Sequence, residues 1–143
     1  MAKTEKQVQS DIIALLQGST LVQSLSGCVY RGTPSSSYRP RSSQKEDLIV
    51  IFTEGAPDEV ETGTVTLNIY VPDIDPYDNG VLVEDGSRTA EIEQLADAWV
   101  SSLTCNRSNY RFKLRQTIYA ERDAAINQHF VVVKLAYQYY GEQ

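Results

Sequence analysis

The C-terminal third of the chain carries the clearest alternation of apolar and polar residues. Successive side chains of a β-strand point to opposite faces, so alternation over 110–121 predicts one long strand with an apolar and a polar side. After a short connection, residues 127–140 predict a second, longer strand, in which His129, Val131, Val133, Leu135 and Tyr137 share one parity. The apolar parity of the first segment consists of Tyr110, Phe112, Leu114, Ile118 and Ala120.

Two segments show apolar residues at helical spacing. In the first, Thr4 and Gln7 have the spacing of a capping box at a helix start, and Gly18 marks the end. A short helical turn over 21–25 is expected next. The second helix is predicted over 87–103, with Trp99 packing it onto the sheet. The apolar stripe of the first helix consists of Val8, Ile12, Leu15 and Leu16. That of the second helix consists of Ile92, Leu95, Ala96, Trp99 and Leu103.

Three further strands are predicted upstream. Residues 28–31 form a brief one. The continuous apolar run at 48–52 is typical of a strand covered on both faces or of one in the sheet centre. Residues 64–71 alternate, and Pro72 ends them. We expect antiparallel pairing of 48–52 with 64–71 and of the last two strands. The predicted fold class is α+β, a mostly antiparallel sheet of about four to five strands with two helices packed on one face, in a single domain over 1–143.

Two long loops, 32–46 and 73–86, interrupt this pattern. A loop of such length in a small domain is either functional or disordered. The loop 32–46 contains two prolines and a serine run, and Tyr38 is its single aromatic residue. Two interpretations stay open for it: a floppy surface loop, or a segment that orders on a partner.

Charge is arranged in blocks. The formal net charge of -6 argues against nucleic-acid binding by the whole molecule, because phosphate contacts need clustered lysine and arginine. Residues 31–45 and 107–115 each hold four basic residues and no acid, whereas 54–61 holds four acids and 73–85 five, without a base. Such blocks suit a surface that meets differently charged partners on different sides, although solubility explains any single block more simply.

Residues suited to catalysis or metal binding are few. His129 is the sole histidine, and its place in a strand favours a structural role. The segment 73–80 begins like a calcium loop, but Tyr77 takes a ligand position and the glycine comes late, so a solvated acidic turn is the better interpretation. We expect no catalytic residue, no metal and no cofactor.

The basic block 107–115 interleaves cations with an aromatic residue. It indicates either a nucleic-acid surface or the solvated face of a strand whose long basic side chains also block edge pairing, and we favour the second. The residues concerned are Arg107, Tyr110, Arg111, Lys113 and Arg115.

Cys28 and Cys105 lie far apart in sequence and lack a metal or redox spacing. We expect both to be small buried hydrophobes in a reducing compartment, with one structural disulfide as the alternative. The N-terminal residues have no apolar signal core, and no apolar run has the length of a membrane span, so a cytoplasmic protein without a membrane partner is expected.

Several short motifs stand in a recognisable order. The chain opens with Asp11-Ile-Ile-Ala-Leu-Leu, the turn 21–25 and Gly27-Cys-Val-Tyr30, and its second helix ends in Ala98-Trp-Val-Ser-Ser-Leu103. This layout resembles that of tailed-phage tail-completion, or tail terminator, proteins, in which a helix and a leucine-containing turn lead to a Gly-x-Val-Tyr strand. An extended strand, a helix and two closing strands follow in that family. The chain departs from it at 47–50, where the family commonly has a proline-initiated strand, and in its longer acidic loop.

The resemblance implies a homo-oligomeric ring, a hexamer, that caps the tail tube and presents a surface to the head-tail connector protein. It implies a place in the virion tail or neck after assembly in the bacterial host cytoplasm. DNA would pass through without specific binding, since an acidic lumen repels phosphates. As a hypothesis, the interaction residues are Arg31, Tyr38, Arg39, Arg41, Lys45, Glu54, Asp58, Glu59 and Glu61.

Two alternatives stay open. One is a connector stopper or another minor virion protein. The other is a small-molecule-binding or enzymatic α+β domain with its cleft between sheet and helix. An enzyme should lose activity with His129→Ala while staying folded, whereas a ring protein should lose self-association when charges in 31–45 or 54–61 are reversed.

Overall fold

The computed structural model describes residues 3–57, 60–103 and 109–140. In this part of the chain, three helices accompany a six-stranded sheet, so the expected α+β class is confirmed with one helix and one strand more than the sequence suggested. The helices are α1 (Glu5–Leu16), α2 (Thr20–Ser24) and α3 (Gly86–Ser102). The strands are β1 (Val29–Gly32), β2 (Leu48–Ala56), β3 (Glu61–Pro72), β4 (Tyr110–Leu114), β5 (Tyr119–Asp123) and β6 (Gln128–Tyr139).

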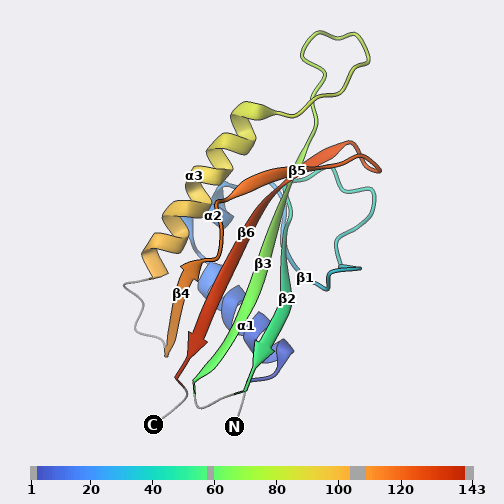
Figure 1. Cartoon of the computed structure of the whole chain (residues 1–143). Coiled ribbons are helices and arrows are strands. Elements are labelled where there is room, and N and C mark those ends of the chain that lie inside the picture. The colour runs from blue at the N-terminus through green and yellow to red at the C-terminus, as the bar shows by residue number, and fades with distance from the viewer. Residues whose placement is uncertain (1–2, 58–59, 104–108, 141–143) are drawn as a thin grey trace.

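The strand order is β1-β2-β3-β6-β4, and β5 also pairs with β6 (Figure 1). The expected antiparallel pairs β2–β3 and β4–β6 are confirmed. The sheet is nevertheless mixed, because β1 runs parallel to β2. Parallel neighbours need a crossover connection, and here that connection is the long loop between β1 and β2.

The predicted single strand over 110–121 is wrong, because the chain breaks it into β4 and β5. Leu114 pairs with Leu135, and Tyr119 pairs with Val132. The chain therefore advances five residues from β4 to β5 while the partner strand β6 advances only three. The two surplus residues are taken up in the irregular segment 115–118 between the strands. An even surplus leaves the side-chain parity unchanged, which explains why nearly the same alternation continues through both strands.

The helices cover one face of the sheet and enclose the main core. Figure 1 shows α1 lying behind the central strands, where its apolar face meets alternate residues of β2, β3 and β6. Trp99 on α3 is buried among them, as expected, and its indole N–H donates to the Leu15 carbonyl across to α1. The predicted capping box also forms: the Gln7 main-chain N–H donates to Thr4 Oγ1, and the Thr4 main-chain N–H donates to Gln7 Oε1. Gly18 ends this first helical segment at a φ of 76°, a conformation that favours glycine.

The second face of the sheet is covered only in part. In β2, Leu48 and Val50 face the helices, whereas Ile49 and Ile51 point to the opposite face and are also buried. The expectation of a strand covered on both faces is therefore confirmed. The loop 33–46 packs on this second face near the C-terminal end of β3, where the Arg39 guanidinium lies 4.2 Å from the Tyr70 ring centroid. We call the remaining, uncovered part the open face.

Cys28 is exposed and free, so the expectation of a buried cysteine is wrong at this position. The thiol stands just before β1, which is an outer strand of the sheet. Cys105 lies outside the described residues. Within those residues, no helix combines the length and apolar character that crossing a membrane requires.

Candidate interaction surfaces

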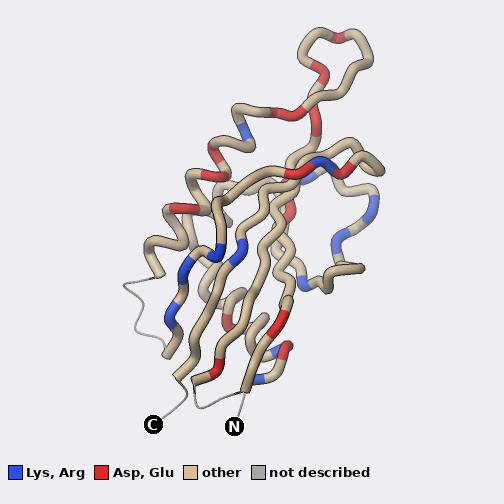
Figure 2. The backbone as a smooth tube through the Cα atoms, viewed as in Figure 1, with Lys and Arg blue, Asp and Glu red and all other residues tan. Residues whose placement is uncertain are grey.

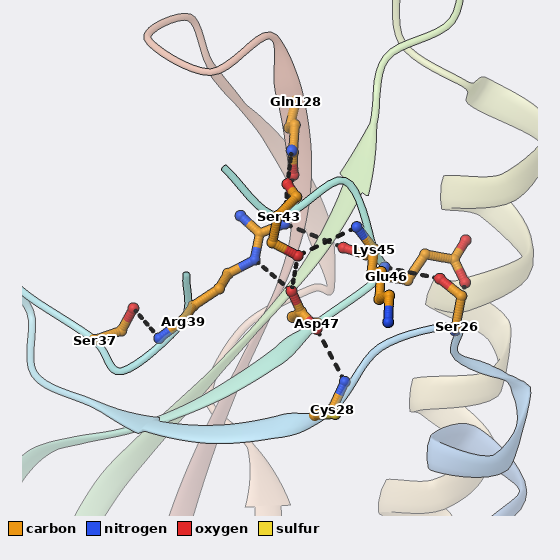
Figure 3. Close-up of polar contacts among 9 residues, drawn as sticks. All are labelled: Ser26, Cys28, Ser37, Arg39, Ser43, Lys45, Glu46, Asp47 and Gln128. Atoms are coloured by element: carbon orange, nitrogen blue, oxygen red, sulfur yellow. Dashed lines mark hydrogen bonds and ion pairs between the residues drawn. The ribbon is translucent and has the colours of Figure 1, made fainter. Parts of the chain in front are cut away.

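The loop 33–46 is held to the sheet by a buried ion pair (Figure 3). Arg39 Nε donates to Asp47 Oδ2 over 2.8 Å, and the two side chains are 5% and 1% exposed. Arg39 Nη2 donates to Gln128 Oε1 at the start of β6 over 2.8 Å. The same nitrogen also donates to the main-chain carbonyls of Ser43 and Lys45. One guanidinium therefore ties the loop to both β2 and β6.

Asp47 is the acceptor at the centre of this network. Ser43 Oγ donates to Oδ2 over 2.6 Å, and the Cys28 N–H donates to Oδ1 over 2.9 Å. Burial alone would raise the pKa of the Asp47 carboxyl, but these hydrogen bonds and the charge of Arg39 outweigh it and hold the pKa below its usual value. The carboxylate is thus stabilised in its charged form.

This lowered pKa predicts acid sensitivity of the fold. The pKa of this carboxyl is near 3.8 in the unfolded chain and lower in the folded protein. Its contribution to stability is therefore fully present above pH 3.8 and is lost as the pH falls through the folded-state pKa. We expect the difference in free energy of unfolding between wild type and Asp47→Asn, measured in urea, to shrink as pH falls from 5 toward the lowered value. A difference that stays constant over this range would show that ionised Asp47 does not stabilise the fold.

The prediction that Arg39 is an interaction residue is wrong. Arg39 is buried in an internal ion pair, so it cannot face a partner. Tyr38, Arg41 and Lys45 are exposed on the same loop, and Arg31 donates to Ser10 Oγ on α1. The loop is therefore a fixed platform that presents some of the predicted side chains and uses one as its anchor.

The open face holds a cleft of about 480 Å³ near the start of β3. The strand register aligns Lys113, Ala136, Thr64 and Glu54 in one row across four strands. A parallel row contains Arg111, Gln138, Thr62 and Ala56. Paired residues of antiparallel strands share a face, so both rows point away from the helices. The cleft is lined by these eight residues together with Gly55, Gly63, Phe112, Arg115 and Tyr137.

A β-bulge brings Glu54 to this cleft. Phe52 pairs with Val65 on the helix face, but the register then shifts and Glu54 pairs with Thr64 on the open face. Without the surplus residue, the alternation from Leu48 would have sent Glu54 into the core. Bulges commonly re-aim a side chain in this way.

The cleft is predominantly cationic. Arg111, Lys113 and Arg115 are exposed along it, against the single carboxylate of Glu54. Arg115 Nη1 lies 3.4 Å from Glu54 Oε1 and donates to Thr64 Oγ1 over 3.0 Å. Exposed ion pairs of this kind contribute little to stability. The basic residues of this strand face are exposed, as both interpretations of the basic block require, and they form a hollowed surface that the sequence did not reveal.

The loop between β3 and α3, residues 73–85, projects from the domain as an arm (Figure 1). Its exposed side chains are unusually apolar for a solvated acidic turn. Five of the seven exposed large hydrophobic residues in the described chain lie on it. They are Ile74, Tyr77, Val81, Leu82 and Val83, which are 39%, 83%, 56%, 43% and 41% exposed. Clustered exposed apolar groups mark interaction sites.

The arm has its own hydrogen-bonded structure. Ile74 and Val83 form an antiparallel bridge with both main-chain bonds at 2.9 Å. The carboxylate of Asp75 accepts the N–H groups of Asn79 and Gly80. Asp75 is therefore occupied as a cap of the turn, and no group of three or more potential metal ligands occurs among the described residues.

His129 anchors the base of the arm. Its Nδ1 lies 2.7 Å from Asp73 Oδ1, and the Asp73 N–H donates to the Asn127 carbonyl. The Asp73 side chain is 1% exposed. The lone histidine thus connects β6 to the first residue of the arm, which is compatible with the structural role expected for it.

The acidic block 54–61 is divided by the structure. Glu54 lines the cleft, whereas Glu61 accepts the main-chain N–H of Lys3. Asp58 and Glu59 lie outside the described residues. The two described acids of the block therefore make different contacts, Glu54 in the cleft and Glu61 with the chain just before α1.

Comparison with known proteins adds no assignment. No family model matches the chain, and no curated protein matches it. Among solved structures, a protein whose name states no activity aligns with a TM-score of 0.44 and 16% identity, over 96% of this chain and 97% of its own. A likeness this weak supports no conclusion about function.

Sequence reasoning missed the apolar character of the arm. The signal was present in Val81-Leu82-Val83, an apolar run inside a loop otherwise rich in aspartate. It was overlooked because the acidic residues dominate the composition of the segment. The cleft gave no comparable signal, because its residues come from four strands and meet only through the sheet register.

Proposed function

We propose that this chain is a non-enzymatic structural subunit that joins copies of itself and neighbouring proteins, as a tail terminator does. The observation that carries the proposal is the arm. It holds five large apolar side chains in water on a hydrogen-bonded hairpin. Moving apolar surface out of water lowers the free energy, so such an arm is suited to burial against a partner.

In the proposed role, the subunits form a ring, a hexamer, that caps the tail tube and meets the head-tail connector in the virion. DNA passes through it without specific binding. The resemblance of the sequence to tail terminators supports this role. Segregated charge supports it too: Figure 2 shows acidic residues on the arm and basic residues on β4, near the other end of the sheet.

Electron microscopy tests this role. Concentrated protein is imaged in negative stain, alone and after incubation with purified tail tubes of the phage or prophage that encodes it. We expect rings of uniform diameter, and tubes closed by a ring at one end. Dispersed single subunits, together with tubes that recruit no protein, would contradict the proposal.

A further inference from the structure

We infer that the arm of one copy inserts into the cleft of a second copy, so that subunits join head to tail. The inference rests on the proposed self-association and names the two surfaces that make the contact. It is carried by three properties of these surfaces: charge, chemistry and position in the fold.

The two surfaces have opposite charge. The arm contains five acidic residues and no basic one. Asp75 and Asp78 flank the tyrosine at its tip, and the Asp75 carboxylate also accepts two N–H groups of the turn. At the base of the arm, Asp73 contacts His129 and Asp85 caps α3. The cleft presents Arg111, Lys113 and Arg115 against one carboxylate. Complementary potentials of this kind favour association and fix its orientation.

The chemistry of the arm tip also suits the cleft. Tyr77 is 83% exposed, and a tyrosine offers a flat apolar ring with a polar end. The cleft combines the apolar side chains of Ala56 and Ala136 with the hydroxyls of Thr62 and Thr64. Its guanidinium groups can also stack on an aromatic ring. The cleft volume of 480 Å³ lies within the range of about 300–1,000 Å³ typical of sites that enclose compact ligands.

The positions of the two surfaces require a second molecule. The arm follows Pro72 at the end of β3, whereas Thr62 and Thr64 in the cleft lie near its beginning. A strand of 12 residues spans about 40 Å, so the arm cannot reach the cleft of its own chain. A contact between two different patches is heterologous, and it generates closed rings or open filaments.

A second copy is the occupant that the observations favour. Both halves of the contact belong to the same sequence, so every subunit brings one arm and one cleft. Neither half is covered within the described chain, because the arm side chains are exposed and the cleft is open. If the cleft instead binds another acidic protein, both variants in the test below should assemble as well as wild type.

The test uses two single variants that each disable one half. Tyr77→Lys removes the ring at the arm tip and places a positive charge between Asp75 and Asp78. Lys113→Glu reverses a charge in the cleft. Both side chains are exposed, so both variants should fold, which circular dichroism checks. The matched controls are Gln17→Lys, which adds the same positive charge at an exposed residue just after α1, and Lys6→Glu, at an exposed lysine of α1.

Sedimentation velocity then measures self-association. We expect Tyr77→Lys to raise the dissociation constant by about thirtyfold, as the loss of an aromatic interface anchor does. Lys113→Glu should raise it by about tenfold. The controls should associate like wild type. A mixture of the two variants should form 1:1 dimers and nothing larger, because one variant retains an intact cleft and the other an intact arm.

The outcomes separate the inference from the proposed function. A wild-type chain that stays monomeric overturns the proposed function and the inference with it. A wild type that assembles while both variants assemble equally well overturns the inference alone. Variants that are both weak but form no mixed dimer also overturn it, since each half would then meet a different partner. Mixed dimers that stop at two subunits support it.

Discussion

Replacing Arg39 with methionine is expected to lower the free energy of unfolding by about 3–5 kcal/mol, the usual cost of removing one partner of a buried ion pair. The Asp47 carboxylate would stay buried without its cation, and Gln128 Oε1 and two main-chain carbonyls would lose a donor. Urea unfolding followed by the fluorescence of Trp99, the single tryptophan, measures the loss.

The matched control is Arg41→Met, because Arg41 is an exposed arginine of the same loop. Its cost should stay within about 0.5 kcal/mol, as for ordinary surface substitutions. The double variant Arg39→Met/Asp47→Asn should recover part of the loss, since it removes the uncompensated charge. Equal stabilities of the Arg39 and Arg41 variants would show that the ion pair does not hold the loop.

A methyl group at position 63 is expected to cost about 3 kcal/mol, near the upper end for an overpacked core. A Cβ on Gly63 would lie 2.5 Å from Tyr137 Cε2 and 2.5 Å from the Glu54 main-chain oxygen. The backbone oxygen cannot rotate away as a side chain can. Gly63→Ala should therefore separate β2 from β3 or displace Tyr137, and it should distort the cleft that these residues line.

Gly86→Ala is the control for this substitution. A Cβ at Gly86 meets no atom within 4 Å, and the residue opens α3, where alanine restricts the unfolded chain more than glycine does. We expect this variant to unfold at the wild-type urea concentration or above it. If Gly63→Ala and Gly86→Ala were equally stable, the close packing of Tyr137 on Gly63 would be refuted.

The sequence predicted the elements whose cause is local. The capping box of Thr4 and Gln7, the conformation of Gly18 and the apolar stripe around Trp99 depend on residues a few positions apart. The antiparallel pair β2–β3 was predictable because alternation in β3 meets a continuous apolar run in β2. These features follow from side-chain periodicity and turn chemistry alone.

Features set by distant residues were not predictable in this way. The break between β4 and β5 inserts an even number of residues, so it leaves no trace in the alternation. In the sequence, Arg39 is indistinguishable from the other basic residues of its loop. Its burial involves a hydrogen bond to Gln128, which lies 89 positions away and so leaves no local signal. The cleft requires the register of four strands, and the bulge before Glu54 changes which residues reach it.

The arm shows how composition can conceal a surface. Five acids in residues 73–85 indicated a solvated turn, and the calcium-like spacing drew attention to Asp75. The structure uses Asp75 to cap the turn and leaves Tyr77 and Val81 exposed. The carboxylates keep an otherwise apolar projection soluble, and they supply the charge that we propose the cleft recognises.

The central claim is that this protein works by associating with itself, and sedimentation equilibrium of the unmodified chain over a wide range of concentration tests it most directly. We predict a molar mass that rises above the 16.0 kDa of one chain and levels off at a fixed whole-number multiple, as a closed ring requires. A single species of 16.0 kDa at every concentration would contradict the claim.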